Sequence, residues 1–237
     1  MIKDLIKNVE GNFFKLTIIN IWRKIITCAN MEEQALKIGI HNPLAIVDYE
    51  YLVREYFSQE VAIINFDSAT NLIAEMEKSS INIGVFLLPS LEDDIDKKDT
   101  MPKKWWINIA SNPVGLKIYA KIPFVKFSSN KNNRNINLVL TAIKDADQSS
   151  SDYTIISLEV ANEIEKNEVI LLLNHNNFNY KILSFVKNSQ FTGISLYLIE
   201  IKDYLIENDL KIKQLLNSKI KPFIKILGHY PEPILLD

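Results

Sequence analysis

The sequence predicts a mixed α/β and α+β protein with a short N-terminal helix pair, a βαβαβ segment and a C-terminal βαββαβ domain. Apolar runs of strand length alternate with longer segments whose apolar residues recur every three or four positions, as in amphipathic helices. A Ser- and Asp-rich stretch, residues 145–152, reads as a linker between the two larger parts. We therefore expect domains at residues 1–35, 36–144 and 153–237.

The first 35 residues favour two helices. Residues 1–10 form the first, and Gly11 ends it because glycine readily adopts the left-handed conformation found past a helix end. Thr17 is expected to cap the second helix. Its apolar stripe comprises Ile18, Trp22, Ile25, Ile26 and Ala29. Two helices cannot form a core alone, so this stripe should pack on the rest of the chain, on another chain or on a missing segment, and it favours a homodimer.

Residues 36–90 have the alternation expected of a parallel sheet. Three strands are predicted, at residues 36–41, 61–66 and 81–88. Pro43 opens the helix after the first strand, and Ser68 caps the helix after the second. Strands joined by helices in this order imply right-handed crossovers.

The middle of the chain is predicted to add strands to this segment. Residues 89–104 are polar and charged and read as a solvated connector. Further strands are expected at residues 105–111, 116–127 and 136–143.

The C-terminal part has the order strand, helix, strand, strand, helix, strand. The predicted strands are residues 153–160, 180–186, 194–201 and 222–227, and the predicted helices are residues 161–175 and 209–218. This is the split βαβ pattern of ferredoxin-like domains.

Composition excludes several classes of function. The net charge is −2, which gives no general case for nucleic acid or an anionic membrane as partner. The single cysteine, Cys28, cannot form an internal disulfide and suits a reducing compartment. The apolar runs are too short to span a membrane, and the three histidines have no metal-ligand spacing. We expect a soluble cytoplasmic protein without a metal or other cofactor.

Four short segments resemble one family of enzymes. Residues 224–231, Ile-Lys-Ile-Leu-Gly-His-Tyr-Pro, are similar to the Val-Leu-Gly-Ser-Tyr-Pro ending of ACT domains in prephenate dehydratases. Residues 66–68 and 83–89 resemble the first half-lobe of the dehydratase domain, which is of the periplasmic-binding-protein type. Residues 21–26, Ile-Trp-Arg-Lys-Ile-Ile, resemble the last helix of all-helical chorismate mutases of alphaproteobacteria. The order of these segments resembles proteins of the chorismate mutase–prephenate dehydratase (P-protein) type.

The resemblance implies a role in phenylalanine and tyrosine biosynthesis, with a small-molecule substrate, chorismate or prephenate. The leading prediction is a chorismate mutase with an incomplete helical region. A non-catalytic regulatory or scaffolding relative and a prephenate dehydratase are the alternatives. Which of these activities the chain has stays open at this point.

The resemblance also implies candidate site residues. A mutase holds a dicarboxylate with cationic groups, for which Lys7 and Arg23 are candidates, and Glu33 aligns with the family's residue at the ether oxygen. Ligand-binding candidates at the carboxyl ends of the predicted parallel strands are His41, Asn42, Ser68 and Ser90, for which ordinary capping and turn chemistry is the alternative.

The chain departs from the family at two sites. Residues 120–124, Ala-Lys-Ile-Pro-Phe, keep the Phe of the dehydratase Thr-Arg-Phe motif but have neither Thr nor Arg. The Gly-Ala-Leu and Glu-Ser-Arg-Pro segments with which such ACT domains bind phenylalanine are replaced at residues 160–163 and 183–186. Feedback by phenylalanine is therefore not expected, and the C-terminal domain would serve mainly for dimerisation.

Overall fold

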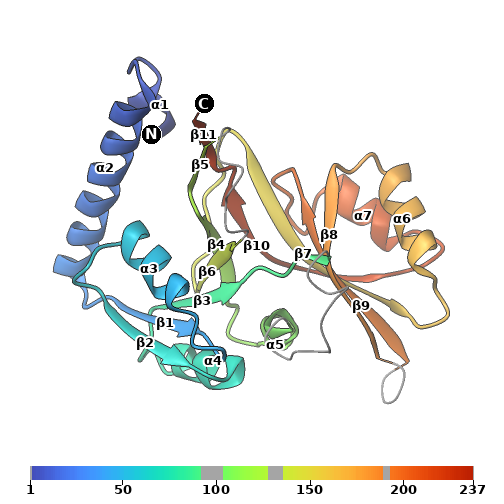
Figure 1. The fold of residues 1–237 in the computed structure, drawn as a ribbon. Helices are drawn as coiled ribbons and strands as arrows, with labels where there is room; N and C mark the ends of the chain where they lie inside the picture. The colour runs from blue at the N-terminus through green and yellow to red at the C-terminus, as the bar shows by residue number, and fades with distance from the viewer. Residues whose placement is uncertain (1, 92–103, 128–135, 189–192, 237) are drawn as a thin grey trace. The chain divides into compact units, whose positions relative to one another are not determined.

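The computed structural model describes residues 2–91, 104–127, 136–188 and 193–236 (Figure 1). The chain divides into two compact units. Unit 1 comprises Met1–Leu87, Lys121–Ala142 and Glu232–Asp237, and unit 2 comprises Leu88–Ala120 and Ile143–Pro231. No helix in the described part of the chain is long and apolar enough to cross a membrane.

Unit 1 is built on strands in the order β2-β1-β3-β6. Its strands are β1 (Lys37–His41), β2 (Ala62–Phe66), β3 (Ile83–Leu87) and β6 (Leu138–Ala142). The first three are parallel, and β6 runs antiparallel to β3. The helices that connect the parallel strands are α3 (Val47–Tyr56) and α4 (Ala69–Glu77). This order confirms the predicted βαβαβ segment.

Close packing of α4 on β1 depends on Gly39. A Cβ atom at this position would lie only 2.2 Å from Cδ1 of Leu72, which is fully buried. Ser68 caps α4 as predicted, because its side chain accepts a hydrogen bond from the backbone N–H of Asn71 at 3.5 Å. The sequence signals therefore placed this helix correctly.

The N-terminal helices differ from their predicted bounds. They are α1 (Ile2–Ile6) and α2 (Asn12–Glu33). Thr17 does not cap α2 but lies inside it, where its hydroxyl donates to the carbonyl of Phe13 at 2.9 Å. The residues of α2 that are buried are Ile19 and Thr27, whereas Ile25, on the predicted stripe, is 52% exposed.

A small apolar cluster holds the first half of α2 in unit 1. Ile19 packs with Ile6 and with Ile234 and Leu236 of β11 (Ile234–Leu236). β11 pairs in parallel with β5 (Val125–Phe127). The end of the chain therefore forms part of the support for its first long helix.

Unit 2 contains the predicted ferredoxin-like order. Its elements are β7 (Asp152–Ala161), α6 (Lys166–His175), β8 (Tyr180–Asn188), β9 (Ile194–Ile201), α7 (Leu210–Leu216) and β10 (Phe223–Pro231). The strands lie in the order β10-β7-β9-β8 with antiparallel neighbours, which confirms the predicted βαββαβ fold. In Figure 1, α6 and α7 lie side by side, and their residues Leu173 and Leu215 share one core with Tyr197 of β9.

Two predicted strands of the middle segment are wrong in part. Residues 105–111 form a helix, α5 (Trp105–Ser111), rather than a strand. Trp105, Trp106 and Ile109 are buried at spacings that fit one helix face, and a short apolar run does not by itself distinguish helix from strand. The predicted strand 116–127 is divided at Pro123, which lacks a backbone N–H, into β4 (Lys117–Ile122) and β5. β4 begins in unit 2 and ends in unit 1.

Gly228 is the residue of β10 at which β4 pairs with it. The structure pairs Gly228 with Ile118 of β4, and Gly228 has φ +140°. A Cβ atom on Gly228 would lie 2.1 Å from the carbonyl oxygen of Ile118. Glycine is therefore required here both by the backbone conformation and by the approach of β4.

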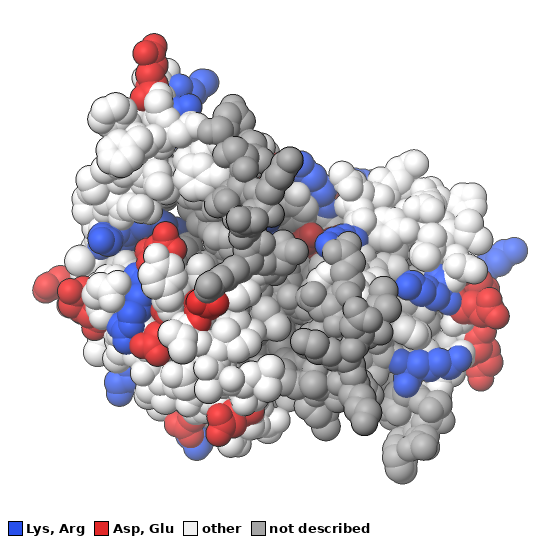
Figure 2. Space-filling model, viewed as in Figure 1, with Lys and Arg blue, Asp and Glu red and all other residues white. Residues whose placement is uncertain are grey.

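Charged side chains are mixed on the surface. On the face drawn in Figure 2, Lys and Arg alternate with Asp and Glu among the described residues. This agrees with the net charge of −2 and gives this face no extended basic surface for a polyanion.

Candidate functional site

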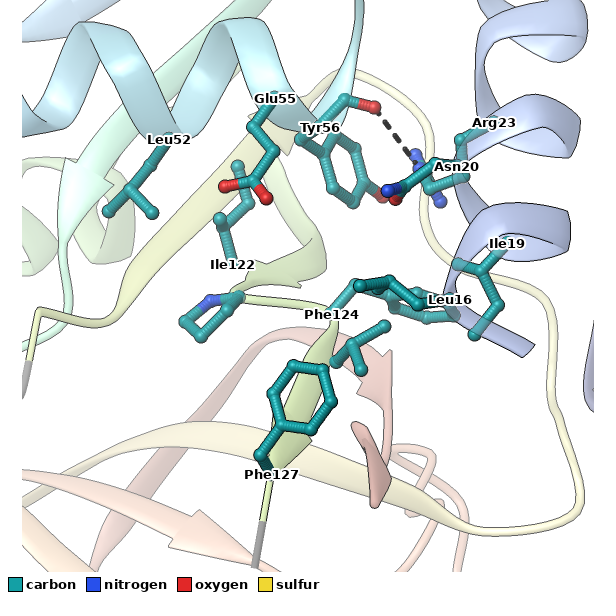
Figure 3. Close-up of a pocket in the computed structure, with 12 residues that line it drawn as sticks. Leu16, Ile19, Asn20, Arg23, Leu52, Glu55, Tyr56, Ile122, Phe124 and Phe127 are labelled. Carbon is teal, nitrogen blue, oxygen red and sulfur yellow. Dashed lines mark hydrogen bonds between the residues drawn. The ribbon is translucent and has the colours of Figure 1, made fainter. Parts of the chain in front are cut away.

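A pocket of unit 1 is lined by Arg23 (Figure 3), and we name it the Arg23 pocket. Its volume is about 110 Å³. Twelve residues line it: Leu16, Ile19, Asn20, Arg23, Leu52, Glu55, Tyr56, Ile122, Pro123, Phe124, Val125 and Phe127. All of them belong to unit 1.

Two helices and the segment 122–127, which runs from the end of β4 through β5, bring these residues together. The α2 residues Leu16, Ile19, Asn20 and Arg23 follow the spacing of one helix face, and so do Leu52, Glu55 and Tyr56 of α3. Residues 122–127 supply the remaining wall, which is apolar. The pocket is therefore formed by one face of each helix and by one short segment that lies far from both helices in the sequence.

Arg23 is held by the end of α3. Its Nε donates to the backbone carbonyl of Tyr56 at 3.3 Å, which satisfies one of the carbonyls left open at a helix C-terminus. Its guanidinium carbon lies 3.3 Å from the centre of the Tyr56 ring and 5.3 Å from that of Phe124, in cation–π geometry. No carboxylate of the described residues forms an ion pair with Arg23.

Burial raises the pKa of the Tyr56 hydroxyl, and the nearby positive charge of Arg23 partly opposes that rise. Tyr56 is therefore neutral at physiological pH and acts as a ring surface with a hydroxyl donor. The pocket thus joins one cationic group to aromatic and aliphatic walls. Such a site is suited to an anionic group attached to an apolar body.

The three predicted catalytic residues are not brought together. Arg23 lies in the Arg23 pocket, but Lys7 is exposed in the turn after α1 and Glu33 is exposed at the last position of α2. Neither Lys7 nor Glu33 lines that pocket. Their catalytic roles stay predictions.

The predicted ligand-binding residues have identifiable local partners. Asn42 forms two hydrogen bonds with Ile46, from its amide to the carbonyl at 3.0 Å and from the backbone N–H of Ile46 to its side-chain oxygen at 2.8 Å. Ser68 caps α4. His41 is buried at the end of β1 beside the ring of Phe86, and Ser90 is half-buried in unit 2. Asn42 and Ser68 therefore perform the capping and turn chemistry that was the alternative for them.

Burial lowers the pKa of His41 below the ordinary value of a histidine. Its ring is therefore neutral at physiological pH. A neutral imidazole donates a hydrogen bond through one nitrogen and accepts through the other.

Sequence reasoning missed Tyr56 and Glu55 as pocket residues. Tyr56 lies on the buried face of α3, where helix periodicity indicates burial but not its contact with Arg23. Glu55 gave no signal beyond its helix position, next to Tyr56 and three residues after Leu52. The contact of Arg23 with Tyr56 joins residues 33 positions apart in the chain, which local periodicity does not report.

A second cavity, in unit 2, has a volume of about 280 Å³. His229 and Lys117 line it, but both side chains already have protein partners. His229 lies 3.0 Å from Asp145 Oδ1 and 2.7 Å from the carbonyl of Leu205, and Lys117 donates to the carbonyl of Ile226 at 2.7 Å. These polar groups therefore hold unit 2 together.

Comparisons with known proteins show which known fold this chain resembles. No protein-family model matches the sequence, and no curated protein matches it either. Among solved structures, prephenate dehydratase from Streptococcus mutans matches with TM-score 0.55 and 11% identity, covering 85% of this chain and 100% of that one. Prephenate dehydratase from Arthrobacter aurescens, in complex with L-Phe, matches with TM-score 0.57 and 9% identity, covering 84% of this chain and 90% of that one.

The chain has a prephenate dehydratase-like fold. The same fold also occurs in GqqA, described as a novel type of quorum-quenching acylase, with TM-score 0.54 and 12% identity over 84% of this chain and 96% of that one. At these identities the similarity establishes the architecture, and the activity has to be argued from the site.

Proposed function

We propose that the chain is a prephenate dehydratase-type protein of aromatic amino-acid biosynthesis, with prephenate as its substrate. The observation that carries this proposal is the fold similarity to prephenate dehydratases over 82–85% of the chain. The sequence resemblance of residues 66–68, 83–89 and 224–231 points to the same family.

The reaction sets clear requirements. Prephenate loses its ring carboxylate as CO₂ and its ring hydroxyl as water, and the product is an aromatic 2-oxo acid. The protein has to bind two carboxylates, and a proton has to reach the departing hydroxyl. A site at the carboxyl ends of β1 and β2 would use the N-terminus of α4 for a carboxylate. His41, whose ring is neutral, would donate a hydrogen bond that positions the hydroxyl, and the proton that leaves with the hydroxyl would come from solvent.

A direct assay tests the proposal. The purified chain is incubated with prephenate, and the expected result is phenylpyruvate at a rate well above that of the uncatalysed reaction. His41→Asn should lower kcat about tenfold or more, because the shorter side chain no longer places its N–H at the hydroxyl. His175→Asn is the matched control, because His175 is exposed on α6. A prephenate rate equal to that of buffer alone would reject the dehydratase.

The chorismate mutase prediction is measured in the same experiment, with chorismate as a second substrate. Its support is the place of Arg23 in a pocket. The exposed positions of Lys7 and Glu33, and the single cation among the described lining residues of that pocket, weigh against it. Conversion of chorismate but not of prephenate would make the mutase the function of this chain.

We also propose that the chain is a homodimer that pairs α2 with its copy. Phe14, Ile21 and Ile25 are 62%, 54% and 52% exposed, and with Ile18 and Cys28 they follow the alternating steps of four and three residues of a helix-pairing seam. Lys15 lies near one end of α2, and Glu32 and Glu33 lie at the other. An antiparallel pair therefore brings unlike charges together, whereas a parallel pair would oppose like charges.

Light scattering during size-exclusion chromatography tests this pairing. The wild type should elute as a dimer, and Ile25→Glu should shift it toward the monomer by placing a charge in the apolar seam. Val47→Glu is the matched control, since Val47 is 81% exposed on α3 of the same unit. A wild-type monomer, or equal dimerisation of both variants, would contradict the pairing through α2.

A further inference from the structure

The Arg23 pocket has a chemical character that the dehydratase reaction does not explain. Eight of its twelve lining residues are apolar: Leu16, Ile19, Leu52, Ile122, Pro123, Phe124, Val125 and Phe127. Figure 3 shows the labelled aliphatic and aromatic members of this set arranged around the space beside Tyr56. A ligand here would bury an apolar body, and burial of apolar area is what binds it.

Charge in the pocket is limited to two side chains. Among the described lining residues, Arg23 is the cation and Glu55 is the anion. The guanidinium has five N–H bonds and uses its Nε to bond the Tyr56 carbonyl, while its Nη atoms meet no carboxylate of the described residues. This leaves a guanidinium that can pair with one carboxylate of a ligand.

A second carboxylate on the same ligand would be unfavourable. It would lie against apolar side chains, where an unpaired charge is costly, or near the carboxylate of Glu55, which repels it. Dicarboxylates such as prephenate and chorismate are therefore poor matches for this pocket.

The aromatic lining favours a flat ring in the ligand. The rings of Tyr56 and Phe124 lie edge to face with their centres 6.4 Å apart, and Phe127 lines the same space. Aromatic pairs in such arrangements gain stability beyond the area that they bury. The cavity volume of about 110 Å³ limits the enclosed part of a ligand to about the size of one ring.

We infer that the Arg23 pocket is a binding site for a small aromatic monocarboxylate, with the carboxylate on Arg23 and the ring against Phe124 and Phe127. None of its lining residues is His41, Asn42 or Ser68. The inference stands without the dehydratase activity, because binding of 3-phenylpropionate does not depend on turnover of prephenate.

Isothermal titration calorimetry of the full chain with 3-phenylpropionate tests this inference. The expected result is binding at least ten times tighter than that of 3-phenylpropan-1-ol, which keeps the ring and lacks the charge. Prephenate, with its second carboxylate, should bind at least ten times more weakly than 3-phenylpropionate at this site. Equal binding of the alcohol, or displacement of bound 3-phenylpropionate by an equimolar amount of prephenate, would overturn the inference.

Variants locate the site. Arg23→Gln should weaken 3-phenylpropionate at least tenfold by removing the ion pair. Arg54→Gln is the matched control and should leave the affinity within threefold, because Arg54 is on α3 outside the pocket and pairs with Glu50. Glu55→Gln should strengthen prephenate more than 3-phenylpropionate, because it removes the carboxylate that repels the second charge of prephenate.

A pocket-filling variant tests the site independently if circular dichroism shows that Arg23→Gln is unfolded. Leu52 is half-buried and lines the pocket, so Leu52→Trp should occupy the ring position and weaken 3-phenylpropionate at least tenfold. Unchanged affinity in Leu52→Trp would place the ligand elsewhere and overturn the inference, whatever the outcome of the prephenate assay.

Discussion

Each unit contains one buried histidine, and the two are held in opposite ways. His41 of unit 1 is 4% exposed and has the Phe86 ring as a neighbour, 5.8 Å between ring centres. His229 of unit 2 is 2% exposed and has an acceptor at each ring nitrogen, Asp145 and the carbonyl of Leu205. Tyr204 stacks on the His229 ring, with the centres 4.3 Å apart.

The difference in partners indicates that His229 is a structural group, whereas the ring of His41 is available for chemistry. Both ring nitrogens of His229 have a protein partner, so the polar atoms of this ring hold unit 2 together. The structure gives the His41 ring no hydrogen-bond partner among the described residues. Equal burial therefore does not imply an equal role, and the partners of each ring decide it.

The largest effect in this comparison should come from His229→Leu. The change removes two hydrogen bonds and leaves the Leu205 carbonyl buried without a partner, so we expect a loss of about 2–4 kcal/mol in the free energy of unfolding. Asp145→Asn keeps an acceptor on a partly exposed side chain and should cost less than about 1 kcal/mol. Urea unfolding measures both. His175→Leu, at an exposed position, is the control, and a His229 loss no larger than that of His175 would show that the cluster is not structural.

A smaller effect should follow from the pH dependence of His41. Burial lowers its pKa in the folded chain, so the unfolded chain takes up the proton at a higher pH than the folded chain does. The stability that depends on neutral His41 is complete above about pH 6.5, the ordinary pKa of histidine, and is lost as pH falls through the folded value. Each pH unit in that window costs at most about 1.4 kcal/mol, the slope of a single proton.

His41→Leu should remove this part of the acid sensitivity and change stability at pH 8 only slightly. Unfolding free energies of wild type and variant, measured from pH 8 to pH 5, should diverge as the pH falls, with the variant losing less. Parallel curves would mean that His41 takes up its proton equally in the folded and the unfolded chain.

Local sequence patterns were sufficient to predict most of the helices and strands. The strands β1, β2 and β3, the Ser68 cap and the six-element order of unit 2 could be predicted, because alternation, periodicity and capping act over a few residues. Trp105 and Trp106 misled the strand prediction for residues 105–111, since bulky apolar residues favour strands yet here pack as one helix face.

The candidate site was predictable only in part. Arg23 could be singled out from a family resemblance, but its pocket depends on Tyr56, 33 residues later, and on Phe124, about 100 residues later. Nothing in the sequence near Arg23 specifies those neighbours, because they are set by how α3 and residues 122–127 meet α2. The pairing of His229 with Asp145, 84 positions apart, was hidden for the same reason.

Gly228 has a consequence for tracing distant relatives of this chain. With the Ile118 carbonyl 2.1 Å from where its Cβ atom would stand, the site has room for hydrogen alone, and its φ of +140° excludes ordinary side chains independently. Any chain that keeps a strand alongside β10 at this step has to keep glycine there, even where the rest of its sequence has diverged beyond alignment. Glycine at this position therefore indicates a neighbouring strand, and a search for distant relatives could require it.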